Sequence, residues 1–146
     1  MKAVLKYPGA KWRISEWIIS HFPEHKVYCE PFFGSGAVFF NKPQTYIETI
    51  NDIDGNIVNL FKVCRDNPEE LARLIEFTPF AREEFENCYD KSDDSLEQAR
   101  RTLVRYHQSF GTSNSSKKSW RNVQTYGGPR TATMWNYLPG RISEIC

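Results

Sequence analysis

Two short apolar runs with a glycine-rich segment between them predict the first strands of the chain. The runs KVYCEPFF (26–33) and TYIETIND (45–52) are rich in aromatic and β-branched residues, which favour strands. Between them, GSGAVFFN (34–41) predicts a glycine turn that leads into a short helix. Before them, KWRISEWIISHF (11–22) places its tryptophans and isoleucines at partly helical spacing, so we expect a helix there.

After the second run, the spacing of the apolar residues becomes that of amphipathic helices. We expect a helix over 54–66, with Asp54 as its N-cap, because its apolar residues recur on one face. The next predicted helix begins at Asn67, as a cap, with Pro68 in the first turn. Further helices are expected over residues 80–89 and 93–110.

Polar residues dominate the segment 111–133, which is rich in Gly, Ser, Thr and Asn and has almost no period. Loops of this length are uncommon in compact domains and are often functional, so we expect a long exposed loop. After it, LPGRISEIC (138–146) predicts the start of another helix or strand. Strands and helices over 146 residues together predict a single domain of the α/β class.

Composition narrows the class of protein. Hydrophobic residues make up 40% of the chain and charged residues 25%, which is ordinary for a folded protein of the cytoplasm. No run approaches the roughly 18 apolar residues of a membrane span or forms a secretory leader, so the cytoplasm is the expected compartment. The four cysteines lack the C-x-x-C spacing of zinc and redox sites, so we expect free thiols and no metal.

The net charge is only +1, but the charged residues are distributed unevenly between two segments of the chain. Residues 1–99 hold 11 Lys and Arg against 17 Asp and Glu, whereas residues 100–141 hold eight Lys and Arg and no acid. Lys and Arg that neutralise phosphates supply most of the non-specific affinity for nucleic acids, so the second segment indicates a polyanionic partner. A charge run on a merely solvated face is the alternative.

The glycine turn and the acid after the second run indicate a nucleoside-containing cofactor. Gly34 and Gly36 let a ligand approach the backbone closely, and Asp52 can accept hydrogen bonds from both hydroxyls of a ribose. The dinucleotide fingerprint G-x-G-x-x-G is absent, because Phe39 stands where its third glycine would be. The pattern therefore favours an adenosyl cofactor and disfavours a nucleotide-dependent oxidoreductase. A glycine turn inside an aromatic core is the alternative.

Three motifs, in this order, resemble those of the Dam-type DNA adenine-N6 methyltransferases: KYPGAK (6–11), EPFFGSGAVFF (30–40) and NDIDGNIVNLF (51–61). The resemblance implies an α/β fold, namely an incomplete Rossmann-like S-adenosylmethionine-dependent methyltransferase fold with a mainly helical target recognition insertion. It also implies S-adenosylmethionine as the cofactor and duplex DNA as the substrate. Ala10, where the family has a second glycine, is a small departure.

The resemblance also implies a set of cofactor contacts by position. Tyr7 would offer an aromatic face near the methionyl part, and Lys11 a cation for its carboxylate. Glu30 would face the ammonium group of the cofactor or cap backbone amides in the turn. The implied cofactor contacts are Tyr7, Lys11, Glu30, Pro31, Phe32, Gly34, Gly36 and Asp52.

Within the resemblance, the basic segment corresponds to the target recognition region. Its Arg-Tyr-His-Gln-Ser stretch and the following loop would contact the phosphates or base edges of duplex DNA. Trp120 belongs either to this surface or to the core. The implied DNA contacts are Arg105, Asn114, Lys117, Lys118 and Arg121.

The family's catalytic motif is missing from these 146 residues. In the family an Asp-Pro-Pro-Tyr motif holds the flipped adenine, and this chain contains no Pro-Pro pair, so we assign no catalytic residue. We expect residues 1–66 to be the N-terminal part of the methyltransferase domain, 67–138 the recognition region and 139–146 the return to that domain. The expected function is adenine-N6 methylation of DNA, with this chain inactive alone. The alternative is a non-catalytic DNA-binding or interaction module derived from such an enzyme.

Overall fold

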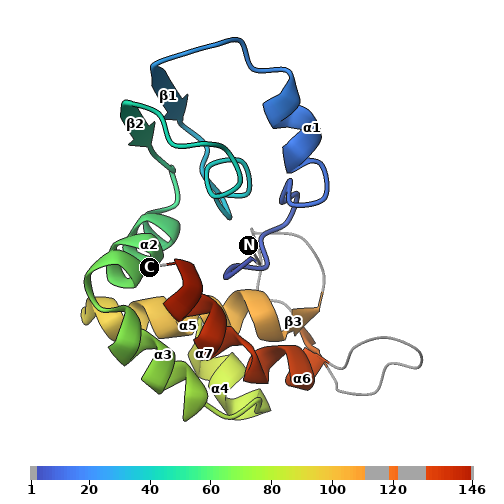
Figure 1. The fold of residues 1–146 in the computed structure, drawn as a ribbon. Helices are drawn as coiled ribbons and strands as arrows, with labels where there is room; N and C mark the ends of the chain where they lie inside the picture. Colours follow the sequence, from blue (N-terminus) through green and yellow to red (C-terminus); the bar gives the residue numbers. More distant parts are fainter. Residues whose placement is uncertain (1–2, 111–118, 122–130, 146) are drawn as a thin grey trace.

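A computed structural model describes residues 3–110, 119–121 and 131–145 of the chain. A small sheet and the first helix lie at one end of the molecule, and most of the helices form a bundle at the other (Figure 1). The connection from the second strand to the second helix joins these two parts. In chain order the elements are α1 (Ser15–Ser20), β1 (Val27–Glu30), β2 (Ile47–Ile50), α2 (Gly55–Asp66), α3 (Pro68–Glu76), α4 (Arg82–Asn87), α5 (Ser95–Gln108), β3 (Ser109–Phe110), β4 (Ser119–Trp120), α6 (Thr131–Asn136) and α7 (Leu138–Ile145).

Both predicted strands are confirmed as β1 and β2. They pair in parallel, with Val27 opposite Ile47 and Glu30 opposite Ile50. Tyr28 has the one buried side chain on these two strands. Parallel strands need a crossover connection, which the chain makes after β1. The glycine turn is the start of this crossover, so it lies at the carboxyl end of β1.

Of the two helices predicted around the sheet, one is shorter than its pattern indicated and the other is not formed. The helix expected over 11–22 is α1, of six residues. Before α1 the chain forms turns, and the indole Nε1 of Trp12 donates to Oγ of Ser35 at 3.0 Å. The helix expected within 34–41 is a series of turns. Contacts with distant residues override the local helical preference in this region.

The helices after the sheet begin where their capping signals indicated. Asp54 caps α2 as predicted, because its carboxylate accepts the Asn56 amide at 2.9 Å. Pro68 opens α3, also as predicted. Asn67 is the N-cap residue of α3, as predicted, but its side chain makes no cap hydrogen bond. Its amide instead donates to Val63 O at 2.8 Å, so Asn67 closes α2 before it opens α3.

The hydrophobic core lies mainly in the helical part. α2 packs against α5, and α3 packs against α7. Each fully buried apolar side chain contributes about 1.5 to 3 kcal/mol, so this packing is the main source of stability. The largest fully buried apolar side chains are Val4, Leu5, Ile57, Leu60, Leu71, Ile75, Phe85, Leu103, Val104, Leu138 and Ile142.

Part of the region 111–133, where a long polar loop was expected, has regular secondary structure. β3 pairs with β4 in an antiparallel hairpin, with Ser109 opposite Trp120 and Phe110 opposite Ser119. α6 begins at Thr131, within the last residues of the expected loop. For the segment 138–146 the sequence allowed either a helix or a strand. Its described residues form the helix α7. The described part of 111–133 is therefore a hairpin strand and a helix start, which short polar stretches do not signal.

A buried histidine makes the stability of the fold depend on pH. Nε2 of His107 donates to Val4 O at 2.8 Å, and its ring lies edge-on to Trp135 at 5.9 Å between centroids. Burial is the main reason why the pKa of His107 is lowered to about 4; the hydrogen bond to Val4 O opposes the shift, and the positive charges of Lys6 and Arg141 add to it. The neutral form is therefore part of the folded state.

Between about pH 7.5 and pH 5, we expect the free energy of unfolding to fall by about 2 kcal/mol more in the wild type than in His107→Gln. In this range the unfolded histidine, with an ordinary pKa near 6.5, takes up a proton that the folded one refuses. Acid therefore favours the unfolded chain. Urea denaturation at a series of pH values measures the difference. Equal pH slopes in the two proteins would contradict the prediction.

Candidate functional site

One carboxylate ties the glycine turn to the end of β2. Gly34 N donates to Oδ2 of Asp52 at 2.7 Å, and Asp54 N donates to Oδ1 of the same side chain at 3.0 Å. Because β1 and β2 are parallel, their carboxyl ends meet at one edge of the sheet, where open α/β folds bind ligands. Asp52 thus holds together the turn, the end of β2 and the start of α2.

The backbone and the chain's own aromatic rings require both glycines of the turn. The angle φ is +53° at Gly34 and +66° at Gly36, in a region that residues with a side chain avoid. A Cβ on Gly34 would lie 3.1 Å from the ring of Tyr7. One on Gly36 would lie 2.5 Å from the rings of Phe33 and Phe40. Internal packing therefore explains the glycines, and clearance for a ligand stays a prediction.

Tyr106 joins this site although the sequence analysis did not single it out. Its ring lies 5.6 Å from that of Tyr7, centroid to centroid, at an angle of 37°. The pKa of Tyr106 is raised to about 12, mainly by burial and in addition by the carboxylate of Asp54. The helical period of α5 places Tyr106 on the buried face with Leu103, which was the available signal. In the sequence Tyr106 lies in the basic segment, which the resemblance relates to DNA contact.

The Glu30 carboxylate accepts a hydrogen bond from a neighbour on the same strand. The Tyr28 hydroxyl donates to Oε2 of Glu30 at 2.7 Å. Burial raises the pKa of Glu30, while the Tyr28 hydroxyl and the Phe39 amide partly oppose this shift. Beside them, the ammonium of Lys42 pairs with Glu48 and lies 4.3 Å from the Tyr28 ring. Of the two roles that the resemblance implied for Glu30, the capping of a backbone amide has the support of these contacts.

The remaining expected cofactor contacts lie on the surface. Nζ of the exposed Lys11 donates to Gly9 O at 2.8 Å. Phe32 is 81% exposed, and Pro31 is exposed beside it. The interactions described above bring together three members of the expected set: Tyr7, Gly34 and Asp52.

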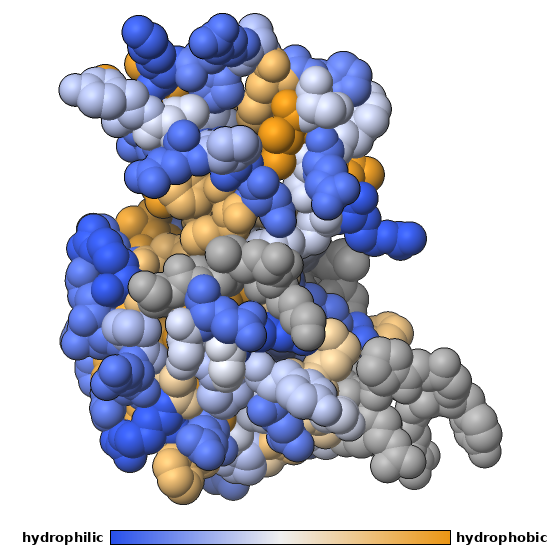
Figure 2. Space-filling view, in the orientation of Figure 1, coloured by the Kyte–Doolittle hydropathy of each residue, from blue (hydrophilic) through white to orange (hydrophobic). Residues whose placement is uncertain are grey.

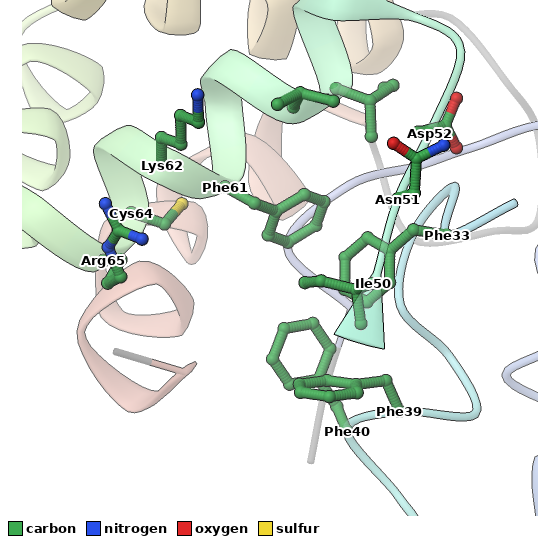
Figure 3. Close-up of a pocket in the computed structure, with 12 residues that line it drawn as sticks. Phe33, Phe39, Phe40, Ile50, Asn51, Asp52, Phe61, Lys62, Cys64 and Arg65 are labelled. Carbon is green, nitrogen blue, oxygen red and sulfur yellow. The ribbon is translucent and has the colours of Figure 1, made fainter. Parts of the chain in front are cut away.

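A cavity of about 480 Å³ opens beside Asp52, between the end of β2 and α2 (Figure 3). Asn51 and Asp52 lie at one end of it, and Lys62 and Arg65 lie at the other. Hydrophobic side chains also show on the surface at the waist between the two parts of the molecule (Figure 2). The volume is within the range of about 300 to 1,000 Å³ that is typical of small-molecule sites. Four phenylalanines line the cavity: Phe33, Phe39, Phe40 and Phe61.

The described DNA candidates lie at two places on the helical part. The guanidinium of Arg105, in α5, lies 5.2 Å from the centre of the Tyr89 ring and borders a second cavity of about 280 Å³. Arg121 follows β4, where its amide donates to Gln108 O at 2.8 Å and its guanidinium lies 5.7 Å from the Phe110 ring. The other candidates lie outside the described residues: Asn114, Lys117 and Lys118.

The sequence left it open whether Trp120 belongs to the DNA-contacting surface or to the core. In the structure its side chain contacts residues of the helical part. Its Nε1 donates to Oε1 of Gln108 at 3.3 Å, and its ring lies 5.8 Å from that of Phe80. The side chain is partly buried and packs against the main hydrophobic cluster. These contacts support the alternative of a core residue.

Acids from earlier in the chain neutralise part of the positive charge of residues 100–141. Arg100 pairs with both Glu84 and Glu97 at 2.7 Å, and Arg101 pairs with Glu97 at 2.7 Å. Arg100 therefore links α5 to Glu84 of α4, and Arg101 is paired with an acid of its own helix. They do not count toward a basic surface for a polyanion.

Other functional features are limited in the part of the chain that the structure describes. No group of three or more His, Cys, Asp and Glu side chains is placed there to hold a metal ion. In the same residues, every helix is too short or too polar to cross a lipid bilayer. Cys29, Cys64 and Cys88 form no disulfide bond with one another, as expected.

Comparison with known proteins finds one family. The family model described as D12 class N6 adenine-specific DNA methyltransferase matches residues 7–132. The DNA N-6-adenine-methyltransferase of Escherichia phage P1 is 34% identical over 50% of this chain and 10% of its own length. The Type II methyltransferase M1.LlaDCHI of Lactococcus lactis subsp. cremoris is 34% identical over 51% of this chain and 26% of its own length. The DNA adenine methylase of Serratia marcescens is 31% identical over 63% and 32%. The aligned segments thus span about a third or less of these three relatives. Because the family model matches most of the chain, the chain belongs to the D12 class of N6 adenine-specific DNA methyltransferases.

Proposed function

We propose that this chain forms the S-adenosylmethionine-binding part and the target recognition region of an enzyme that methylates adenine N6 in duplex DNA. The observation that carries the proposal is the Asp52 carboxylate, which fixes the glycine turn at the carboxyl edge of two parallel strands. In this assignment β1 and β2 belong to an incomplete Rossmann-like sheet. Residues 1–66 form the cofactor part, 67–138 the recognition region and 139–146 the return to the methyltransferase domain.

The residues around Asp52 fit S-adenosylmethionine. Each oxygen of Asp52 accepts one backbone amide, and a carboxylate oxygen can accept a second hydrogen bond, so both can still bind ribose hydroxyls. The Tyr7 ring, packed against Gly34 and Tyr106, offers a flat face, and the exposed ammonium of Lys11 can pair with the methionine carboxylate. The cofactor would supply a methyl group activated by its positive sulfur. The proposed site is completed by Glu30, Pro31, Phe32 and Gly36.

Duplex DNA is the proposed substrate, contacted through the basic residues of the recognition region. Arg105 and Arg121 are the described candidates, and they belong to α5 and to the residue after β4. Adenine must leave the base stack for N6 to reach a methyl donor, and the family's Asp-Pro-Pro-Tyr motif for that task is absent from these 146 residues. We therefore propose that the chain alone binds cofactor and DNA without transferring the methyl group.

Calorimetry with S-adenosylmethionine tests the cofactor part of the proposal. We expect the wild type to bind and Asp52→Ala to bind at least about tenfold more weakly, because the variant loses both the ribose partner and the anchor of the turn, a cost of about 1.4 kcal/mol or more. Asp52→Asn, which keeps one acceptor oxygen, should fall between the two.

A matched control is Asp66→Ala, because Asp66 is exposed and pairs with Arg65 on the surface of α2. It should bind the cofactor like the wild type. Equal affinity of Asp52→Ala and Asp66→Ala would refute the ribose role of Asp52. Absence of binding in the folded wild type, together with retained DNA binding, would support the non-catalytic module instead.

A further inference from the structure

The second cavity, of about 280 Å³, lies in the helical part of the molecule. Asn56 of α2 and Arg105 and Tyr106 of α5 contribute to its wall, as does Lys91 of the connection between α4 and α5. Its volume is just below the range of about 300 to 1,000 Å³ of typical small-molecule sites, which suits a small ligand. The side chains that line it all carry a polar group, and none of these described residues is Asp or Glu. The wall therefore differs from that of the cavity beside Asp52, which is rich in phenylalanine.

The wall of this second cavity is positively charged near pH 7. Lys91 is exposed and forms no ion pair with an acid in the part of the chain that the structure describes. The guanidinium of Arg105 lies 5.2 Å from the centre of the Tyr89 ring. The pKa of the Cys88 thiol is raised to about 12, mainly by burial, so this thiol stays protonated. The wall thus carries two cations and no carboxylate.

A chain of hydrogen bonds occupies the oxygens of the amide side chains in the wall and leaves N–H donors. Ser92 N donates to Oε1 of Gln98 at 2.8 Å, which fixes the orientation of this amide. Nε2 of Gln98 donates to Oδ1 of Asn56 at 3.1 Å, and Nδ2 of Asn56 donates to Oδ1 of Asp54 at 3.0 Å. Each amide nitrogen has two N–H groups, so Gln98 and Asn56 each keep one donor for a ligand.

The hydroxyl of Tyr106 is a further donor at this cavity. The residue is 6% exposed, and its hydroxyl makes no hydrogen bond to any residue within the described ranges. Most buried polar side-chain atoms have a hydrogen-bond partner, so the Tyr106 hydroxyl indicates a bound molecule. Asp54 acts on Tyr106 through its charge alone, and one of its carboxylate oxygens accepts both the backbone amide and the side chain of Asn56.

We propose that the second cavity binds a phosphate group, with Lys91 and Arg105 as its cations and the Tyr106 hydroxyl as a buried donor. A phosphate offers several acceptor oxygens and negative charge, which match a wall of donors and cations. The group belongs either to a free phosphate compound or to DNA, because the same chemistry recognises both. The site goes beyond the proposed function, since S-adenosylmethionine carries no phosphate and Asp52 is not among the residues that line this cavity.

Titration of the whole chain with inorganic phosphate tests the proposal. Chloride keeps the ionic strength constant, so that the screening of charges does not change during the titration. We expect saturable binding in the millimolar range, with shifts of the backbone NMR signals of Lys91, Gln98 and Tyr106. Chloride alone should cause neither.

Two variants and a matched control locate the binding. Tyr106→Phe keeps the ring that packs on Tyr7 but removes the donor. It should bind phosphate at least about tenfold more weakly, the effect of a lost hydrogen bond to a charged group. Lys91→Gln should weaken binding about three- to fivefold, because Lys91 is an exposed cation. Lys26→Gln removes the same charge from the residue before β1 and should bind phosphate like the wild type.

A short DNA duplex distinguishes the two sources of the phosphate group. If the group is part of DNA, both variants should weaken duplex binding, and Lys91→Gln should lower the slope of its salt dependence by about one. If the group belongs to a free compound, both variants should lose affinity for inorganic phosphate and bind the duplex like the wild type. The proposal is overturned if neither variant weakens the binding of phosphate or of the duplex. None of these measurements involves the cofactor, so a failure of S-adenosylmethionine binding would refute the proposed function and leave the phosphate site intact.

Discussion

Replacement of Gly36 by alanine is expected to lower the free energy of unfolding by about 3 kcal/mol. The backbone angle φ of +66° disfavours any residue with a Cβ, which accounts for about 1 kcal/mol. The new methyl group would lie 2.5 Å from Phe33 Cζ and Phe40 Cε2, so two rings of the aromatic cluster must move. Phe33 is 5% exposed and packs edge-on against Phe61, so it has little room to move.

Urea denaturation measures this loss, and Gly55→Ala is its matched control. Gly55 is the first residue of α2, and a Cβ there would meet no atom within 4 Å. Because alanine favours the helix and restricts the unfolded chain, the control should be unchanged or more stable by up to about 1 kcal/mol. Similar losses in both variants would mean that the close packing at Gly36 is not the cause.

Arg100→Met is expected to lower the free energy of unfolding by about 3 kcal/mol, because it breaks a largely desolvated charge network. The Arg100 side chain is 14% exposed, and its guanidinium binds Glu97 through two nitrogens and Glu84 through a third. Methionine keeps the apolar stem but leaves Glu84 without this partner. Arg101 still pairs with Glu97 in the variant, which limits the loss.

The control for this variant is Arg73→Met, which breaks a surface pair with Glu70 that is about half exposed on both sides. Exposed pairs contribute about 1 kcal/mol or less, so the control should be nearly neutral. A second readout is the acid limb of the stability curve. The hydrogen bonds from Arg100 hold the pKa of Glu97 at about 2, so this stabilisation is present above about pH 4.5 and is lost as the pH falls toward 2. Arg100→Met should show a smaller loss over that range, and an unchanged curve would contradict the role of Glu97.

The strands and most helices were predictable because their signals are local. β1 and β2 follow β-branched and aromatic runs, and Asp54 caps α2 through an amide two residues away. The predictions failed where distant residues intervene. The helix expected over 11–22 is shortened where Trp12 reaches Ser35, 23 residues further on.

The candidate site shows the same division. The glycine turn and Asp52 were found from spacing, because a tight turn and an acid at a strand end leave a recognisable pattern. Tyr106 was missed, since it reaches Tyr7 across 99 positions, from another part of the chain. Arg100 and Arg101 counted as free positive charge until the fold placed Glu84 and Glu97 beside them.

The amino-acid sequence indicated both strands of the first sheet, the glycine turn, most of the helices and the family, because capping, turn preference and motif spacing act over a few residues. The fold assigned the partners of the polar groups and the purpose of the glycines. The packing of the Tyr7 ring against Gly34 and the neutral His107 bound to Val4 O arise from contacts between residues far apart in the chain. Such contacts depend on burial and on the direction of side chains, which no local pattern specifies.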